Sequence, residues 1–147
     1  MKYLVGILLA LGLSQATYAA CSVGSGTYGL SAIGWGTDDN VNPNTKFAIA
    51  GVWTFSVGFA NPHLKPALTG IVERSFVFNA GGSATPVISG SGTYKVDPAT
   101  CSGTVTFPHT PTANEVETYQ IFVTSPTVIY WVNTTKGIVL SGRMTRP

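Results

Sequence analysis

Charged side chains are scarce in this sequence. Only 10% of the 147 residues are Asp, Glu, Lys or Arg, whereas an ordinary soluble domain has about a quarter. The formal net charge is +2, and the eight Lys and Arg residues are scattered along the chain. The dense basic patch of a nucleic-acid-binding protein is therefore missing. We expect no nucleic-acid partner.

Metal ligands are also few. The chain has two Cys and two His, and their positions lack the paired spacing of a zinc site. His63 and His109 lie in proline-flanked loops, which are typical of surface histidines. Asp38 and Asp39 sit in an Asn-rich loop that offers oxygen ligands, but the ordered frame of a calcium-binding EF-hand is absent. We expect no metal and no cofactor.

A long apolar run occurs only at the N-terminus. Met1-Lys2 is followed by "YLVGILLALGL" and then by small residues that end at Ala20, which is the pattern of a cleavable signal peptide. The run is too short for a transmembrane helix, which needs about 20 apolar residues. The sequence therefore predicts a signal peptide over residues 1–20, one domain over residues 21–147, and export to a bacterial periplasm or to the extracellular space.

The two cysteines favour a structural disulfide. Cys101 and His109 would lie at opposite ends of one strand, more than about 20 Å apart, so His109 cannot activate Cys101 as a nucleophile. A Cys21–Cys101 disulfide needs only the oxidising compartment that export provides. The alternative is a lipoprotein anchored through Cys21, because a cysteine directly after two alanines resembles a lipobox. Tyr18 disfavours this alternative, since that position usually holds Leu.

Alternating apolar and polar residues dominate the rest of the chain. In residues 53–59, Trp53, Phe55, Val57 and Phe59 share one face, as in a half-buried strand. Similar segments with turn residues between them cover residues 27–32, 73–79, 90–96, 102–108, 118–124, 127–133 and 137–144. A sheet of about eight strands hides its edges best by closing. We therefore predict an all-β fold, a single antiparallel up-and-down β-barrel.

Four segments resemble a group of small exported bacterial proteins, mostly without an assigned function. They are residues 26–39, 46–57, 89–107 and 119–147, and they include "GTYKV" followed by "CSGT" and the C-terminal "GIVLSGRMTRP". The resemblance implies a calycin-like barrel, similar in shape to lipocalins and to the allene oxide cyclase barrel. In lipocalin-like barrels an Arg stacks on a Gly-x-Trp tryptophan and closes one end. Here the resemblance implies that role for Trp53 with Arg143 or Arg146.

Three classes of function remain open. The first is a non-enzymatic barrel that binds a small apolar ligand, and the second is a structural or cell-surface interaction protein with a packed core. The third is an isomerase or cyclase with Glu73 in an apolar interior, which we favour least. Glu115 and Glu117 alternate with Val116, so we expect both to face solvent. The candidate ligand-binding residues are Trp53, Phe55, Glu73, Tyr94, Tyr119 and Trp131; we identify no catalytic residue.

Overall fold

The computed structural model describes residue 21 and residues 23–36, 45–57, 68–108, 116–135 and 138–147. Within these ranges every regular element is a β-strand. A helix long and apolar enough to cross a membrane is not found among the same residues. Residues 1–20, Asp38, Asp39, His63, His109 and Glu115 lie outside the described residues.

Nine strands are present in the described part of the chain. They are β1 (Gly26–Gly36), β2 (Lys46–Val57), β3 (Leu68–Ala80), β4 (Ser83–Ala84), β5 (Ile88–Asp97), β6 (Ser102–Phe107), β7 (Glu117–Ser125), β8 (Val128–Asn133) and β9 (Ile138–Thr145). β2 and β3 extend beyond the predicted segments at residues 46–52 and 68–72, and the two-residue β4 was not expected.

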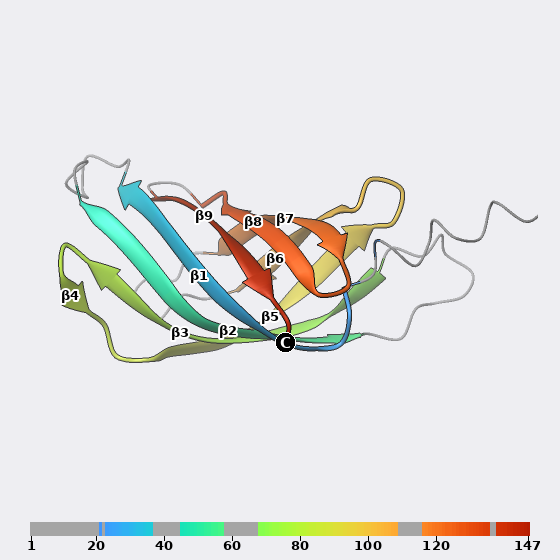
Figure 1. Cartoon of the computed structure of the whole chain (residues 1–147), viewed down its shortest axis with the longest axis horizontal. Coiled ribbons are helices and arrows are strands. Elements are labelled where there is room, and N and C mark those ends of the chain that lie inside the picture. Colours follow the sequence, from blue (N-terminus) through green and yellow to red (C-terminus); the bar gives the residue numbers. More distant parts are fainter. Residues whose placement is uncertain (1–20, 22, 37–44, 58–67, 109–115, 136–137) are drawn as a thin grey trace, which may run out of the picture.

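The strands close into a single antiparallel barrel, as predicted. Each strand pairs with its sequence neighbour except around β4, and β1 pairs with both β2 and β9. The pairing of β2 with β3 completes a ring of eight strands, while β4 adds only two residue pairs to the end of β3. Figure 1 shows the strands curling around one axis, with β4 at one end of the barrel. We call this the β4 end.

Alternation along each strand decides which side chains enter the barrel. On β1, Tyr28, Leu30 and Ala32 are buried, whereas Ser31, Ile33 and Trp35 are exposed on the outer wall. The same period of two holds on the other strands, because successive side chains of a strand point to opposite faces. A single core of apolar side chains therefore fills the barrel.

Large rings occupy the interior at contact distance. The ring of Trp53 lies 5.9 Å from that of Trp131 and 4.9 Å from that of Tyr119, measured between centroids. Two inward glycines make room for such rings: a Cβ at Gly92 would lie 2.7 Å from a Phe107 ring carbon, and one at Gly142 would lie 3.0 Å from Trp131. The interior is thus closely packed with side chains around these rings.

The end opposite β4 is held by the N-terminal segment. Cys21 forms a disulfide with Cys101, which confirms the predicted pairing, and Cys21 and Val23 are buried. The Tyr28 hydroxyl donates hydrogen bonds to the carbonyl oxygens of Gly24 and Pro126, at 3.0 and 2.6 Å. Since the sulfur of Cys21 is bonded to Cys101, the lipid anchor considered above is incompatible with this structure. We call this the disulfide end.

Candidate functional site

Five of the predicted ligand-binding residues lie together in the barrel interior. They are Trp53, Phe55, Tyr94, Tyr119 and Trp131, and all are buried. The ring of Phe55 contacts two others in this cluster. Its centroid lies 6.3 Å from that of Trp53 and 5.2 Å from that of Tyr94. The structure shows these residues packing against one another, and their contact with a ligand stays a prediction.

Glu73 is not an interior residue. It is exposed on the outer wall, next to Thr54 on β2 and Ser91 on β5, and lines a shallow outer pocket of 370 Å³. Its neighbour Arg74 points inward instead, because adjacent side chains on a strand take opposite faces. Glu73 thus has the exposed position on the barrel wall that the sequence favoured, and the inward-facing position that a role inside the barrel would need is not found. The isomerase hypothesis needed Glu73 as an acid inside the barrel, and Glu73 does not lie there.

The expected barrel-closing pair does not form. Trp53 is inside the barrel, whereas Arg143 on β9 is exposed on the outer wall between Ser31 and Tyr130. The wall separates the guanidinium of Arg143 from the indole of Trp53. Arg146, the other candidate, donates a 2.7 Å hydrogen bond to the carbonyl oxygen of Ser25 at the disulfide end.

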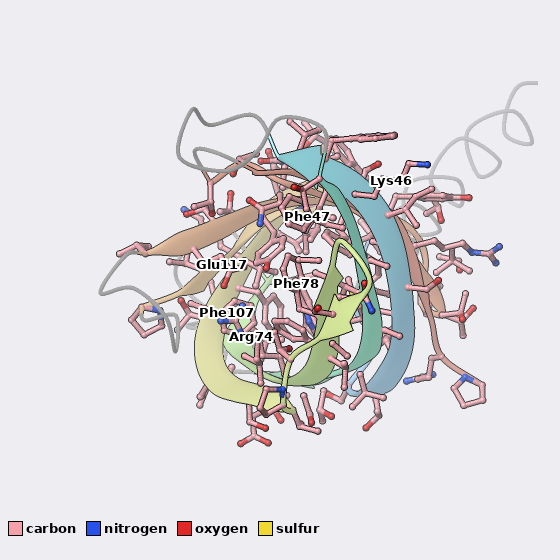
Figure 2. The ribbon with its side chains drawn as sticks, turned by 90° about the vertical axis from the view of Figure 1, so that its left-hand side faces the viewer. Lys46, Phe47, Arg74, Phe78, Phe107 and Glu117 are labelled. Carbon is pink, nitrogen blue, oxygen red and sulfur yellow. A yellow bond between two sulfur atoms is a disulfide. The ribbon has the colours of Figure 1, made fainter. Side chains whose placement is uncertain are left out.

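An ion pair lies inside the barrel towards the β4 end. Arg74 Nη1 lies 2.5 Å from Glu117 Oε2, and only 1% of the Arg74 side chain and 14% of the Glu117 side chain are exposed. The Tyr119 hydroxyl donates a hydrogen bond to Glu117 Oε1. The guanidinium of Arg74 also stacks over the ring of Phe107 at 3.9 Å. Figure 2 looks into this end and shows Arg74, Glu117 and Phe107 on one side of the interior.

The expectation that Glu117 faces solvent was wrong. Glu117 has the same parity along β7 as the buried Tyr119, Ile121 and Val123, so the strand period places its side chain inside. Glu115, Val116 and Glu117 do alternate with a period of two. The expectation placed Val116 on the inward face, but the structure shows Val116 exposed. Reading β7 from its apolar residues would have found Glu117.

Burial and the neighbouring carboxylate disfavour ionisation of Tyr119. Loss of solvent raises the pKa of its phenol most, and the negative charge of Glu117 and the hydrogen bond to it raise the pKa further. Arg74 opposes these effects only in part. Tyr119 therefore stays a neutral donor to Glu117, and the charge of Glu117 is balanced by Arg74. Arg74 Nε and Trp131 Nε1 are buried without a hydrogen-bond partner among the described residues.

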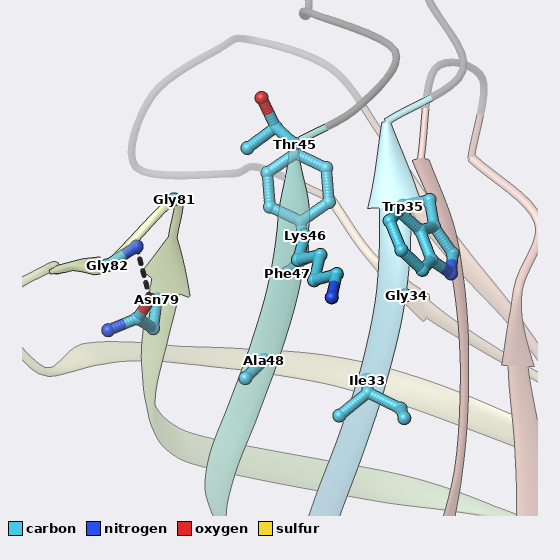
Figure 3. Close-up of a pocket in the computed structure, with 10 residues that line it drawn as sticks. All are labelled: Ile33, Gly34, Trp35, Thr45, Lys46, Phe47, Ala48, Asn79, Gly81 and Gly82. Atoms are coloured by element: carbon cyan, nitrogen blue, oxygen red, sulfur yellow. Dashed lines mark hydrogen bonds between the residues drawn. The ribbon is translucent and has the colours of Figure 1, made fainter.

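A second feature lies at the rim of the β4 end. A pocket of 640 Å³ is formed by β1, β2 and the turn between β3 and β4. Its lining consists of Ile33, Gly34, Trp35, Thr45, Lys46, Phe47, Ala48, Asn79, Gly81 and Gly82. Figure 3 shows these residues on the two adjacent strands and the nearby turn. Ten residues from three segments thus converge on one concave surface.

Exposed and buried rings both line this rim pocket. Trp35 is 49% exposed and Ile33 is 78% exposed, and the Lys46 Nζ lies 5.3 Å from the centroid of the Trp35 ring. Phe47 is buried and stacks on Phe78 at 5.0 Å. On β1, Trp35 has the same parity as the exposed Ser31 and Ile33, which places it on the outer wall. The exposed side chains of Trp35 and Ile33 thus form an apolar surface beside the ammonium group of Lys46.

The turn beside the pocket is fixed by its glycines. Gly81 and Gly82 have φ angles of 58° and 93°, a backbone conformation that glycine adopts without steric cost. The Gly82 N–H donates to Asn79 Oδ1 at 3.1 Å, and the Gly81 N–H donates to the Lys46 carbonyl oxygen at 3.1 Å. These bonds tie the turn to its own strand and to β2. The rim pocket is therefore held in shape from both sides.

Neither end of the barrel shows a metal centre in the part of the chain that the structure describes, since no group of three or more His, Cys, Asp or Glu gathers there.

The fold and the rim pocket define a closed eight-stranded β-barrel with a small-molecule-sized pocket at one end. No family model and no curated protein matches the chain. Among solved structures, it is similar to the redesigned β-barrel b11L5F_LGL, with a TM-score of 0.55 and 20% identity over 88% of this chain and 96% of that one.

Two further redesigned barrels are similar, and both are described as bound to DFHBI. mFAP1 has a TM-score of 0.51 and 21% identity over 87% of this chain and 99% of that one. mFAP0 has a TM-score of 0.52 and 19% identity over 85% of this chain and 100% of that one. At these identities the likeness establishes the barrel fold alone.

The interior ion pair gives a prediction about stability. Replacing Glu117 with Gln removes the counter-charge of Arg74, and an unpaired buried charge costs about 3 kcal/mol. We expect Glu117→Gln to lower the free energy of unfolding in urea by that amount. The double variant Arg74→Met/Glu117→Gln, which removes both charges, should recover a large part of the loss.

The adjacent exposed carboxylate provides the control. Glu73→Gln should change the free energy of unfolding by less than about 0.5 kcal/mol, as is usual for a surface position. If Glu117→Gln proved as mild as Glu73→Gln, the ion pair would not be the stabilising contact described here.

Proposed function

We propose that this protein is an exported, non-enzymatic β-barrel that binds a small apolar ligand in the rim pocket at the β4 end. The observation that carries the proposal is the 640 Å³ pocket with Trp35 half exposed on its wall. Ligand sites are concave, mostly apolar and of a few hundred Å³ or more, and this pocket has those properties. A large aromatic left exposed beside a pocket also gains free energy when a ligand covers it.

The packing of the interior favours the rim over the centre of the barrel. Trp53, Tyr119 and Trp131 already contact one another where a central ligand would have to lie. Opening a cavity there would break contacts worth several kcal/mol. The redesigned barrels mFAP0 and mFAP1, bound to DFHBI, are precedents for ligand binding by a barrel of this shape. We place the ligand of this protein at Trp35 rather than at the predicted interior aromatics.

The proposal of export rests on the N-terminus and on the disulfide. Residues 1–20 have the charge and apolar pattern of a signal peptide. The Cys21–Cys101 bond uses both cysteines of the chain, and such bonds persist in oxidising compartments. Cleavage after Ala20 would leave Cys21 at the start of the mature protein, bonded to the β5–β6 turn.

Mass spectrometry tests export and the disulfide together. Protein exported from a bacterial host without reductant should have the mass of residues 21–147 less two hydrogens. Retention of residues 1–20 would contradict cleavage, and an added diacylglyceryl group would contradict the disulfide.

A specific observation supports a second candidate, a protein that binds other macromolecules through its outer wall. Phe122 and Tyr130 lie directly opposite each other on β7 and β8, and both are nearly half exposed. Val132 and Val139 extend the exposed apolar surface along β8 and β9 towards Trp35. Exposed apolar surfaces of this kind mark interaction sites in soluble proteins.

A neutral fluorescent probe separates the two candidates. N-phenyl-1-naphthylamine becomes bright in apolar sites, and we expect it to bind at the rim pocket. Trp35→Ala should weaken that binding about tenfold, which corresponds to about 1.4 kcal/mol for the lost stacking surface. The matched control is Tyr130→Ala, an equally exposed aromatic outside the pocket, which should leave the affinity unchanged. Equal losses in both variants would favour the outer wall as a whole and contradict a ligand site at Trp35.

A further inference from the structure

We propose that the rim pocket selects small aromatic ligands that carry an anionic group, and that Lys46 is the residue that recognises this group. The inference rests on the proposed function, because it assigns the ligand class of the same pocket. It depends on three features of the described residues: the charge of the lining, the hydrogen-bonding groups that are left free, and the position of Lys46 against Trp35.

Among the described residues, the lining contains one charged side chain, and it is positive. Lys46 is exposed on β2, and the described lining includes no Asp or Glu. Among the described residues the only ion pair joins Arg74 to Glu117 inside the barrel, so no described carboxylate neutralises Lys46. A cationic ligand would meet an unbalanced positive charge, whereas an anionic ligand would complement it.

The hydrogen-bonding groups of the lining favour an acceptor. Asn79 Oδ1 accepts from the Gly82 N–H, which orients the amide, and its NH₂ group, which only donates, has no partner among the described residues. Lys46 Nζ likewise only donates. The Gly81 N–H is bonded to the Lys46 carbonyl oxygen and is not free. A carboxylate or sulfonate, which accepts at every oxygen, matches these donors better than a hydroxyl or an amine.

The position of Lys46 explains why the body of the ligand should be aromatic. The Lys46 ammonium lies over the Trp35 ring, 5.3 Å from its centroid, so a ligand anion paired with Lys46 is brought close to a large exposed ring. Ile33 and Ala48 pair across β1 and β2 and extend the apolar surface beyond that ring. Planar rings stack on an indole with a gain beyond that of simple burial.

Two probes that differ by one sulfonate group test the inference. 8-Anilinonaphthalene-1-sulfonate has the ring system of N-phenyl-1-naphthylamine with one added sulfonate. An exposed ion pair contributes up to about 1 kcal/mol, so wild-type protein should bind the sulfonate about fivefold more tightly than the neutral probe. Raising the ionic strength from about 0.1 M to about 1 M should remove this preference, because salt screens exposed charges.

The variant Lys46→Gln should abolish the preference by reducing the ratio of the two affinities to about one. Its control is Lys95→Gln, which removes an exposed lysine of β5 outside the rim pocket and should keep the wild-type ratio. If the sulfonate showed no preference in the wild type, or if Lys95→Gln reduced the ratio as much as Lys46→Gln, selection by Lys46 would be refuted. Failure of both probes to bind would instead refute the proposed ligand site itself.

Discussion

Closure of the sheet is the constraint on which the rest of the structure depends. The pairing of β2 with β3 joins the two ends of the strand order, so every strand of the ring has a partner on each side. A ring of eight strands encloses only enough space for side chains or one small ligand. Trp53, Tyr119 and Trp131 take up that space. Closure therefore fixes a filled interior and leaves the rim and the outer wall for interactions with other molecules.

The filled interior also determines how polar groups are accommodated. Arg74 enters the barrel because of its position on β3, and its charge is acceptable there because Glu117 and the Phe107 ring contact the guanidinium. Tyr119 satisfies the second carboxylate oxygen of Glu117. These contacts pair the charges with one another, although Arg74 Nε and Trp131 Nε1 keep no described partner. The rim differs because its pocket is open and its wall includes the half-exposed ring of Trp35, and this difference is why binding is assigned to the rim.

The alternation of apolar residues was enough to predict a closed antiparallel barrel, and the cysteine count together with the predicted export was enough to predict the Cys21–Cys101 bond. The same alternation determines that Glu73 is outside and Glu117 inside, once the inward face is chosen from the surrounding apolar residues. Tertiary pairing decided the rest. That Arg74 meets Glu117, 43 residues away, or that Trp35 joins the Asn79–Gly82 turn in a pocket depends on register across strands, which local patterns do not encode.

The three tryptophans allow the most direct test of where a ligand binds. Trp35 lines the rim pocket, whereas Trp53 and Trp131 lie in the packed interior. Each indole N–H gives its own signal in a ¹H–¹⁵N correlation spectrum of the full barrel, and each can be assigned by substitution. On titration with N-phenyl-1-naphthylamine, the account predicts a progressive shift of the Trp35 signal while the signals of Trp53 and Trp131 stay in place. A shift of the Trp53 and Trp131 signals without one at Trp35 would contradict it and would place the ligand inside the barrel.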